Sequence, residues 1–125
     1  MPRPKLVDSS ANRLGERVPL SPPVYHVLLA LGTDAKHGYA MMRSLEEMTD
    51  GKEQLLPGTL YATIAKMVEA GLIEETDPPA PDADSRRRYY RTTPHGLAVA
   101  SNESARIQLL LSVAKRQGIQ PERAG

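Results

Sequence analysis

Apolar residues recur three and four positions apart in four stretches of the chain, which is the spacing of one face of an α-helix. Ser21 before two prolines is expected to cap the first stretch, and Gly71 to end the third. The stretches predict helices at residues 22–31, 38–49, 57–70 and 94–117. The apolar faces expected to be buried are Met41, Met42, Leu45 and Met48 in the second helix and Leu60, Ile64, Met67 and Val68 in the third.

Between the third and fourth helices the hydrophobic period changes to two, which is typical of β-strands. Residues 72–76 and 87–92 are expected to pair as an antiparallel hairpin, with the Pro- and Asp-rich loop 78–85 at its tip. Three helices followed by a hairpin are the order of a winged helix-turn-helix domain. The predicted fold is mainly α with a small β-hairpin: a winged helix-turn-helix domain followed by a C-terminal dimerisation helix.

The same pattern divides the chain into four segments. Residues 1–20 hold three prolines and four basic residues without a periodic apolar face, and they are predicted to form a flexible basic arm. The winged helix-turn-helix domain is expected at residues 21–93, the dimerisation helix at 94–117 and a tail at 118–125. A chain of 125 residues has room for one such domain.

Composition narrows the classes of protein that fit this pattern. The chain has no Cys, which excludes disulfide frameworks and Cys-ligated metal centres. Its aromatic residues are five Tyr, with no Phe and no Trp, so the core is expected to be aliphatic. No segment approaches the roughly 20 apolar residues of a membrane span, and the N-terminus lacks the apolar run of a signal peptide. A cytoplasmic protein without a membrane partner is predicted.

The distribution of charge is more informative than its total. The formal net charge of +1 alone gives no sign of a nucleic-acid partner. Residues 21–85, however, sum to −7, whereas residues 86–91 carry +4 from four arginines. DNA carries one negative charge per ≈1.7 Å of its axis, so a local group of arginines near a groove matters more than the total. This pattern favours double-stranded DNA as the partner.

The residues expected to contact DNA lie on two predicted elements and at the start of a third. The third helix presents a small, polar face, which allows its N-terminus to approach a groove ≈12 Å wide. The second strand carries the arginines, which are expected at the DNA backbone or minor groove. The predicted DNA-binding residues are Thr59, Tyr61, Thr63, Lys66, Tyr39, Arg86, Arg87, Arg88 and Arg91. For Tyr61, core packing with only its hydroxyl at a phosphate is an equal alternative.

Alternation along the second strand sets a limit on these contacts. It places Arg87, Tyr89 and Arg91 on one face and Arg88 and Tyr90 on the other. The four arginines therefore cannot all contact the same groove. One of the two tyrosines is expected to be buried against the third helix, and the sequence leaves open which.

The last helix has more apolar surface than packing on its own domain requires. The surplus predicts a second copy of the chain as partner, through a homodimer interface of Ile107, Leu110, Leu111 and Ala114. Residues 101–104 before it are polar and are expected to be exposed or to line a crevice.

Several short motifs occur in one order along the chain. They are His37-Gly38-Tyr39, Pro57-Gly58-Thr59-Leu60-Tyr61, Gly71-Leu72-Ile73, Arg88-Tyr89-Tyr90 and Thr93-Pro94-His95-Gly96. In this order and spacing, residues 21–117 resemble the PadR family of transcriptional regulators. The resemblance implies a cytoplasmic prokaryotic repressor that dimerises through its C-terminal helix and often releases DNA when a small-molecule effector binds. The basic arm is an addition to the family pattern, and the absence of Trp argues against an aromatic drug pocket.

Nothing in the sequence indicates catalysis. His26, His37 and His95 are scattered, no phosphate-binding or nucleophile motif is present, and the carboxylates are expected on solvated faces. No enzyme activity, cofactor or metal is predicted. The main alternative is a winged-helix module that binds another protein through its last helix and does not bind DNA. The acidic wing tip and the −7 charge of residues 21–85 favour that alternative.

Overall fold

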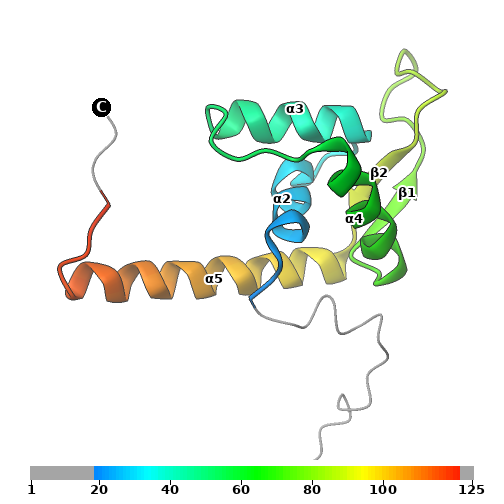
Figure 1. Ribbon diagram of the computed structural model, residues 1–125. Helices are drawn as coiled ribbons and strands as arrows, with labels where there is room; N and C mark the ends of the chain where they lie inside the picture. The colour runs from blue at the N-terminus through cyan, green and yellow to red at the C-terminus, as the bar shows by residue number, and fades with distance from the viewer. Residues whose placement is uncertain (1–18, 122–125) are drawn as a thin grey trace, which may run out of the picture.

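The computed structural model describes residues 19–121 (Figure 1). Its elements, in chain order, are α2 (Pro22–Leu31), α3 (Gly38–Met48), α4 (Pro57–Glu69), β1 (Ile73–Thr76), β2 (Tyr89–Thr92) and α5 (Pro94–Arg116). The four predicted helices and the hairpin are therefore confirmed, with ends that differ by one or two residues. The predicted arm at residues 1–20 lies outside the described residues except for its last two, and Leu20 is buried in the core rather than part of an arm.

Three of the four helices begin at a proline, and their caps differ. Ser21 occupies the N-cap of α2, but its side chain makes no capping hydrogen bond, contrary to the expectation from the sequence. The ring of His37 caps α3 instead, because its Nδ1 accepts a hydrogen bond from the Ala40 N–H. Thr93 caps α5 by accepting from the Gly96 N–H. These caps satisfy backbone donors that helix ends leave unpaired.

The core lies where α2, α3 and α4 meet the base of the hairpin. Its largest fully buried side chains are Leu31, Met41, Leu45, Leu60, Met67, Leu72, Ile73 and Val27, so the prediction of an aliphatic core is confirmed. Met48 is 59% exposed, because it is the last residue of α3 and the end of this helix extends beyond α2 (Figure 1).

The buried face of α4 is rotated from the predicted one. Val68 is 41% exposed, whereas Thr63, predicted to lie on the exposed face, is only 8% exposed. The predicted buried face, with Val68, and the observed one, with Thr63, both fit a helical period. Val68 lies about 100° around the helix from Met67, at one edge of the buried stripe, while Thr63 lies about 40° from Met67 at the other edge.

The hairpin pairs Ile73 with Thr92 and Thr76 with Tyr89. The second strand begins at Tyr89 rather than at the predicted residue 87, because Asp84 occupies the backbone N–H groups just before it: its carbonyl accepts from Arg87 N–H and its carboxylate from Arg86 N–H. The backbone of Lys36, before α3, exchanges two hydrogen bonds of 3.0 Å with Tyr90. The hairpin is therefore tied to the entrance of α3.

A tight corner joins the hairpin to α5. The Thr93 hydroxyl donates to the backbone carbonyl of Gly71 at 2.6 Å. A Cβ atom at Gly96 would collide with the backbone carbonyl of Leu72. Glycine is thus required at this position because two backbones approach each other closely.

The two halves of α5 have different surroundings (Figure 1). The first half packs against α2 and buries Val99 and Glu103, while the second half projects beyond the rest of the fold. Residues 101–104 were expected to be exposed or to line a crevice, and Ser101, Asn102 and Ser104 are exposed. Glu103 is only 3% exposed, which contradicts the expectation that carboxylates lie on solvated faces. The burial is tolerated because Arg106 Nε and Nη2 donate to the carboxylate at 2.9 and 2.7 Å. No helix in residues 19–121 is long and apolar enough to span a membrane.

Candidate nucleic-acid interface

The exposed face of α4 borders a groove. Its walls are the first turn of α2, at Ser21 and Pro23, and the α4 residues Gly58, Thr59, Ala62, Thr63 and Lys66, which enclose a volume of about 450 Å³. Thr59 and Lys66 are exposed, as predicted, and Lys66 forms no ion pair with the described residues. Thr63 is at the floor of the groove and too buried to present its side chain as freely as the sequence suggested.

Three of the four wing arginines have acidic partners. Arg86 Nε lies 3.1 Å and Arg87 Nε 3.6 Å from the Asp84 carboxylate, and Arg91 Nε lies 2.7 Å from Glu74. Hydrogen bonds from the Arg86 side chain and backbone lower the pKa of Asp84 to about 2, so this carboxylate is ionised at neutral pH. Exposed ion pairs of this kind contribute little stability, so the arginines can exchange a carboxylate for a phosphate.

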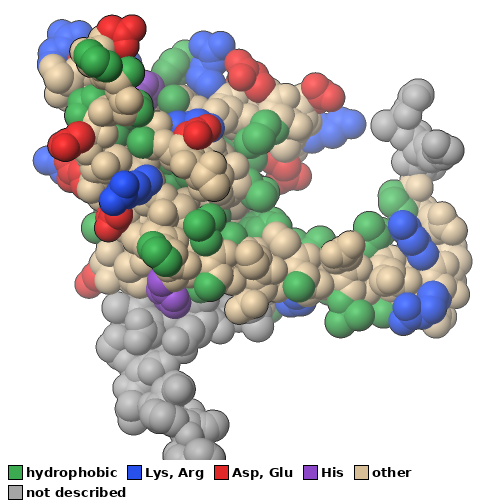
Figure 2. Space-filling view, turned by 180° about the vertical axis from the view of Figure 1, so that it is seen from behind, with side chains coloured by type: hydrophobic (Ala, Val, Ile, Leu, Met, Phe, Trp, Pro, Cys, Tyr) green, Lys and Arg blue, Asp and Glu red, His purple; other side chains and the backbone are tan. Residues whose placement is uncertain are grey.

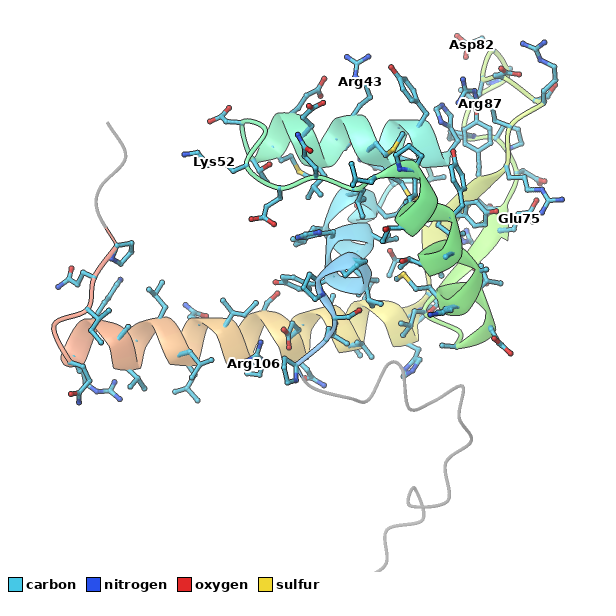
Figure 3. The ribbon with its side chains drawn as sticks, viewed as in Figure 1. Arg43, Lys52, Glu75, Asp82, Arg87 and Arg106 are labelled. Carbon is cyan, nitrogen blue, oxygen red and sulfur yellow. The ribbon has the colours of Figure 1, made fainter. Side chains whose placement is uncertain are left out.

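Positive and negative side chains are consequently mixed on the wing and α3. Figure 2 shows Lys and Arg side chains interspersed with Asp and Glu over these elements, rather than a continuous positive surface. Arg88 is the wing arginine for which no ion pair with residues 19–121 is formed. In Figure 3, Arg87 lies between the wing and the first turn of α3, and Asp82 lies at the wing tip.

Arg87 and the first turn of α3 are linked through His37. The Arg87 Nη1 atom lies 3.2 Å from His37 Nδ1, and the Arg87 guanidinium carbon lies 5.8 Å from the centroid of the Tyr39 ring. Arg43, one turn along α3, covers the same ring at 5.9 Å. Tyr39, a predicted DNA-binding residue, is 47% exposed. Its ring is flanked by the two guanidinium groups. These cation–π contacts hold positive charge at the start of α3.

The structure shows which of Tyr89 and Tyr90 is buried, a question that the sequence left open. Tyr89 is the buried one, at 5% exposure, and its ring meets the edge of His37 at 5.4 Å between centroids. Tyr90 is half-buried and packs against the core. Tyr61 is 55% exposed, which argues against the alternative in which its ring packs in the core.

Tyr61 and the wing share one cavity. Its volume is about 340 Å³, and it is lined by His37, Gly38, Tyr61, Arg87, Arg88 and Tyr90. The exposed side of α4 is therefore contiguous with the arginines of the wing. Seven of the nine predicted DNA-binding residues thus fall into two groups. Thr59, Thr63 and Lys66 lie at the groove beside α2, and Tyr39, Tyr61, Arg87 and Arg88 lie around the cavity or at the start of α3 next to it. Arg86 and Arg91 line neither and pair with Asp84 and Glu74.

Sequence reasoning missed the contributions of His37, Gly38 and Asp84. His is not a preferred N-cap residue, so propensity gave no signal for the capping by its ring. The proximity of Asp84 to two arginines in sequence was a usable signal for ion pairs. Within the described part of the chain, no group of three His, Asp or Glu side chains is arranged as metal ligands.

The arrangement of three helices and a β-hairpin defines a winged-helix protein. Residues 27–102, more than half of the chain, match the family described as Transcriptional regulator PadR-like family, and the chain belongs to it. This match confirms the family resemblance inferred from the motifs. A comparison with curated proteins finds no match.

Solved structures of regulators share the fold. A transcriptional regulator from Clostridium thermocellum is 22% identical, with a TM-score of 0.60 over 76% of this chain and 87% of its own. RosR of H. salinarum is 27% identical, with a TM-score of 0.54 over 76% of this chain and 77% of its own. A PadR-like transcription factor from Bacteroides fragilis is 18% identical, with a TM-score of 0.59 over 74% and 86%.

Proposed function

We propose that the protein is a cytoplasmic transcriptional repressor that binds a pseudo-palindromic operator as a homodimer. The observation that carries this proposal is the cavity shared by Tyr61 of α4 and Arg87 and Arg88 of the wing, because it brings side chains of the two elements together where one DNA duplex would contact both. In this arrangement α4 enters a major groove and the wing contacts the flanking backbone. The winged helix-turn-helix segment would be residues 21–93.

The proposed dimer is formed by the projecting half of α5. Ile107, Leu110 and Leu111 are 41%, 53% and 41% exposed, and the neighbouring Ala114 is half-buried. Apolar side chains follow this part of the helix in Figure 2. A second copy of α5 would cover them and place two α4 helices in successive major grooves, ≈34 Å apart. The dimerisation helix would then be residues 94–117.

A small-molecule effector fits this scheme if it binds near α2 and α5 and changes the spacing of the two α4 helices. Such an effector must bind the two spacings with different affinity, since an equal affinity shifts nothing. Family membership supports this part of the proposal.

The test is a titration in which the protein is added to labelled DNA from upstream of its own gene. Binding is measured by fluorescence anisotropy at two salt concentrations. We expect sequence-selective binding that weakens as salt rises, because bound phosphates release counterions. The triple variant Arg86/Arg87/Arg88→Ala should bind all sequences more weakly and lower the slope of log K against log salt by roughly 0.9 for each phosphate that it no longer neutralises. An unchanged slope would remove the wing from the mechanism.

The alternative is a module that binds another protein and not DNA. The pairing of Arg86 and Arg87 with Asp84 and of Arg91 with Glu74 favours it, because it reduces the free positive charge of the wing. The same titration decides between the two. No sequence-selective binding at either salt concentration would favour the protein-binding module.

A further inference from the structure

We propose that His37 and Gly38 form a junction that fixes Arg87 of the wing and Tyr61 of α4 relative to each other, so that both elements bind DNA as one surface. The proposal rests on the DNA-binding function proposed above. His37 and Gly38 are positioning residues in this scheme, because they act through Arg87 and Tyr61. The junction surrounds the cavity of about 340 Å³ that the two elements share.

The wing side of the junction depends on one ring atom. His37 Nδ1 accepts a hydrogen bond from the Ala40 N–H at 3.1 Å and lies 3.2 Å from Arg87 Nη1. An arginine side chain can only donate, so Nδ1 must be the unprotonated nitrogen of the ring. The Ala40 N–H at the cap of α3 and the guanidinium of the wing arginine therefore share the single lone pair of Nδ1.

The groups that face His37 set the pH range of this contact. Arg87 and Asp84 face it from the wing, Tyr39 from α3 and Tyr89 from β2. Desolvation, and then the charge of Arg87, lower the pKa of His37 from its usual 6.5, while Asp84 opposes the shift. The Nδ1 acceptor is therefore present above pH 6.5 and is lost as the pH falls through the lowered pKa.

The α4 side of the junction depends on the absence of a side chain. A Cβ atom at Gly38 would lie 2.8 Å from the Tyr61 hydroxyl oxygen and 2.9 Å from Tyr61 Cε1. Only glycine lets the Tyr61 ring lie against the first turn of α3. Since Tyr61 is more than half exposed, an added methyl group would displace its ring rather than unfold the domain.

A double-mutant cycle tests the wing side. DNA affinity is measured by anisotropy for His37→Ala, Arg87→Ala and the double variant. We expect each single variant to lose roughly 5- to 20-fold and the double variant to lose no more than Arg87→Ala alone. The control cycle pairs His37→Ala with Lys66→Ala, whose losses should multiply because Lys66 lies at the other groove.

The variant His37→Ser separates positioning from helix capping. Ser caps helices well, so this variant should melt close to the wild type, but its Oγ is one bond closer to the backbone than His37 Nδ1 and does not reach Arg87. We expect its DNA affinity to match that of His37→Ala. The ratio of wild-type to His37→Ser affinity should be largest above pH 6.5 and shrink toward one in acid. A ratio of one at all pH values would overturn the wing side.

A second cycle tests the α4 side. Gly38→Ala should lose roughly 5-fold in DNA affinity with little change in thermal stability, and Gly38→Ala/Tyr61→Ala should bind like Tyr61→Ala alone. The junction would be overturned if the wild type binds DNA normally but the losses in affinity multiply in both the Gly38/Tyr61 and the His37/Arg87 cycles. That result would leave the proposed function standing. Absence of DNA binding by the wild type would overturn both.

Discussion

Two carboxylates each hold an arginine in this fold, but in opposite environments. On α5, Glu103 is 3% exposed and accepts two hydrogen bonds from Arg106, which lies where the chain enters α2 (Figure 3). On the wing, Asp84 accepts two from the Arg86 side chain, which is 89% exposed. The buried Glu103 carboxylate cannot lose Arg106 without being left as an unpaired charge, whereas the exposed pair can exchange its carboxylate for another anion. The comparison separates a stabilising region at the α2–α5 contact from a binding region at the wing.

The largest effect should come from the corner that positions α5. In Gly96→Ala the new Cβ would meet the backbone carbonyl of Leu72, and neither backbone can move away without disturbing the Thr93 cap. We expect a loss of about 3 kcal/mol in the free energy of unfolding, measured by urea denaturation. Gly58→Ala is the matched control, since nothing lies within 4 Å of its Cβ position. Equal stability of the two variants would show that the corner is not tight.

The next effect should come from the buried carboxylate. Hydrogen bonding from Arg106 lowers the pKa of Glu103, so its contribution to stability is present above the unfolded pKa of about 4.5 and is lost as the pH falls through the folded pKa. Glu103→Gln should lower the Tm by roughly 4–8 °C at pH 7 and by less below pH 4.

The exposed Glu75, which forms no ion pair within residues 19–121, supplies the control for this change. Glu75→Gln should leave the Tm nearly unchanged at both pH values. If Glu103→Gln behaves in the same way, the distinction between a buried and an exposed carboxylate fails.

The smallest effect should come from the wing. Asp84→Asn removes the carboxylate that pairs with Arg86 and Arg87 and should raise DNA affinity a few-fold in the anisotropy titration, with little change in Tm. Because the pKa of Asp84 is about 2, this gain should be constant from pH 6 to 8. Asp82→Asn makes the same change in charge at the wing tip without freeing an arginine, so its gain should be smaller. Equal gains would mean that the net charge alone matters.

Local patterns in the sequence were enough for the fold. Helical periods, prolines at helix starts and the change of period after Gly71 predicted the elements, because these signals depend on neighbouring residues. The rotation of α4 that buries Thr63 and exposes Val68 was not predictable, since both residues fit the same period. Which one faces inward depends on the packing of α4 against α2 and β1.

The candidate site was predictable only in part. The arginines and Tyr61 were found from charge and position, but their partners depend on contacts between distant segments. His37 and Arg87 are fifty residues apart in sequence, and only the folded hairpin brings them together. Burial of Glu103 likewise depends on where α2 crosses α5, which no local pattern encodes.

The central claim is that α4 and the wing form one DNA-binding surface, and amide chemical shifts of the full chain test it most directly. ¹⁵N spectra are recorded with and without a duplex of the upstream DNA. We predict that the largest shifts cluster at residues 57–66 of α4 and 84–91 of the wing and appear together along the titration. Shifts confined to residues 107–114 of α5, or none in the wing, would contradict the account.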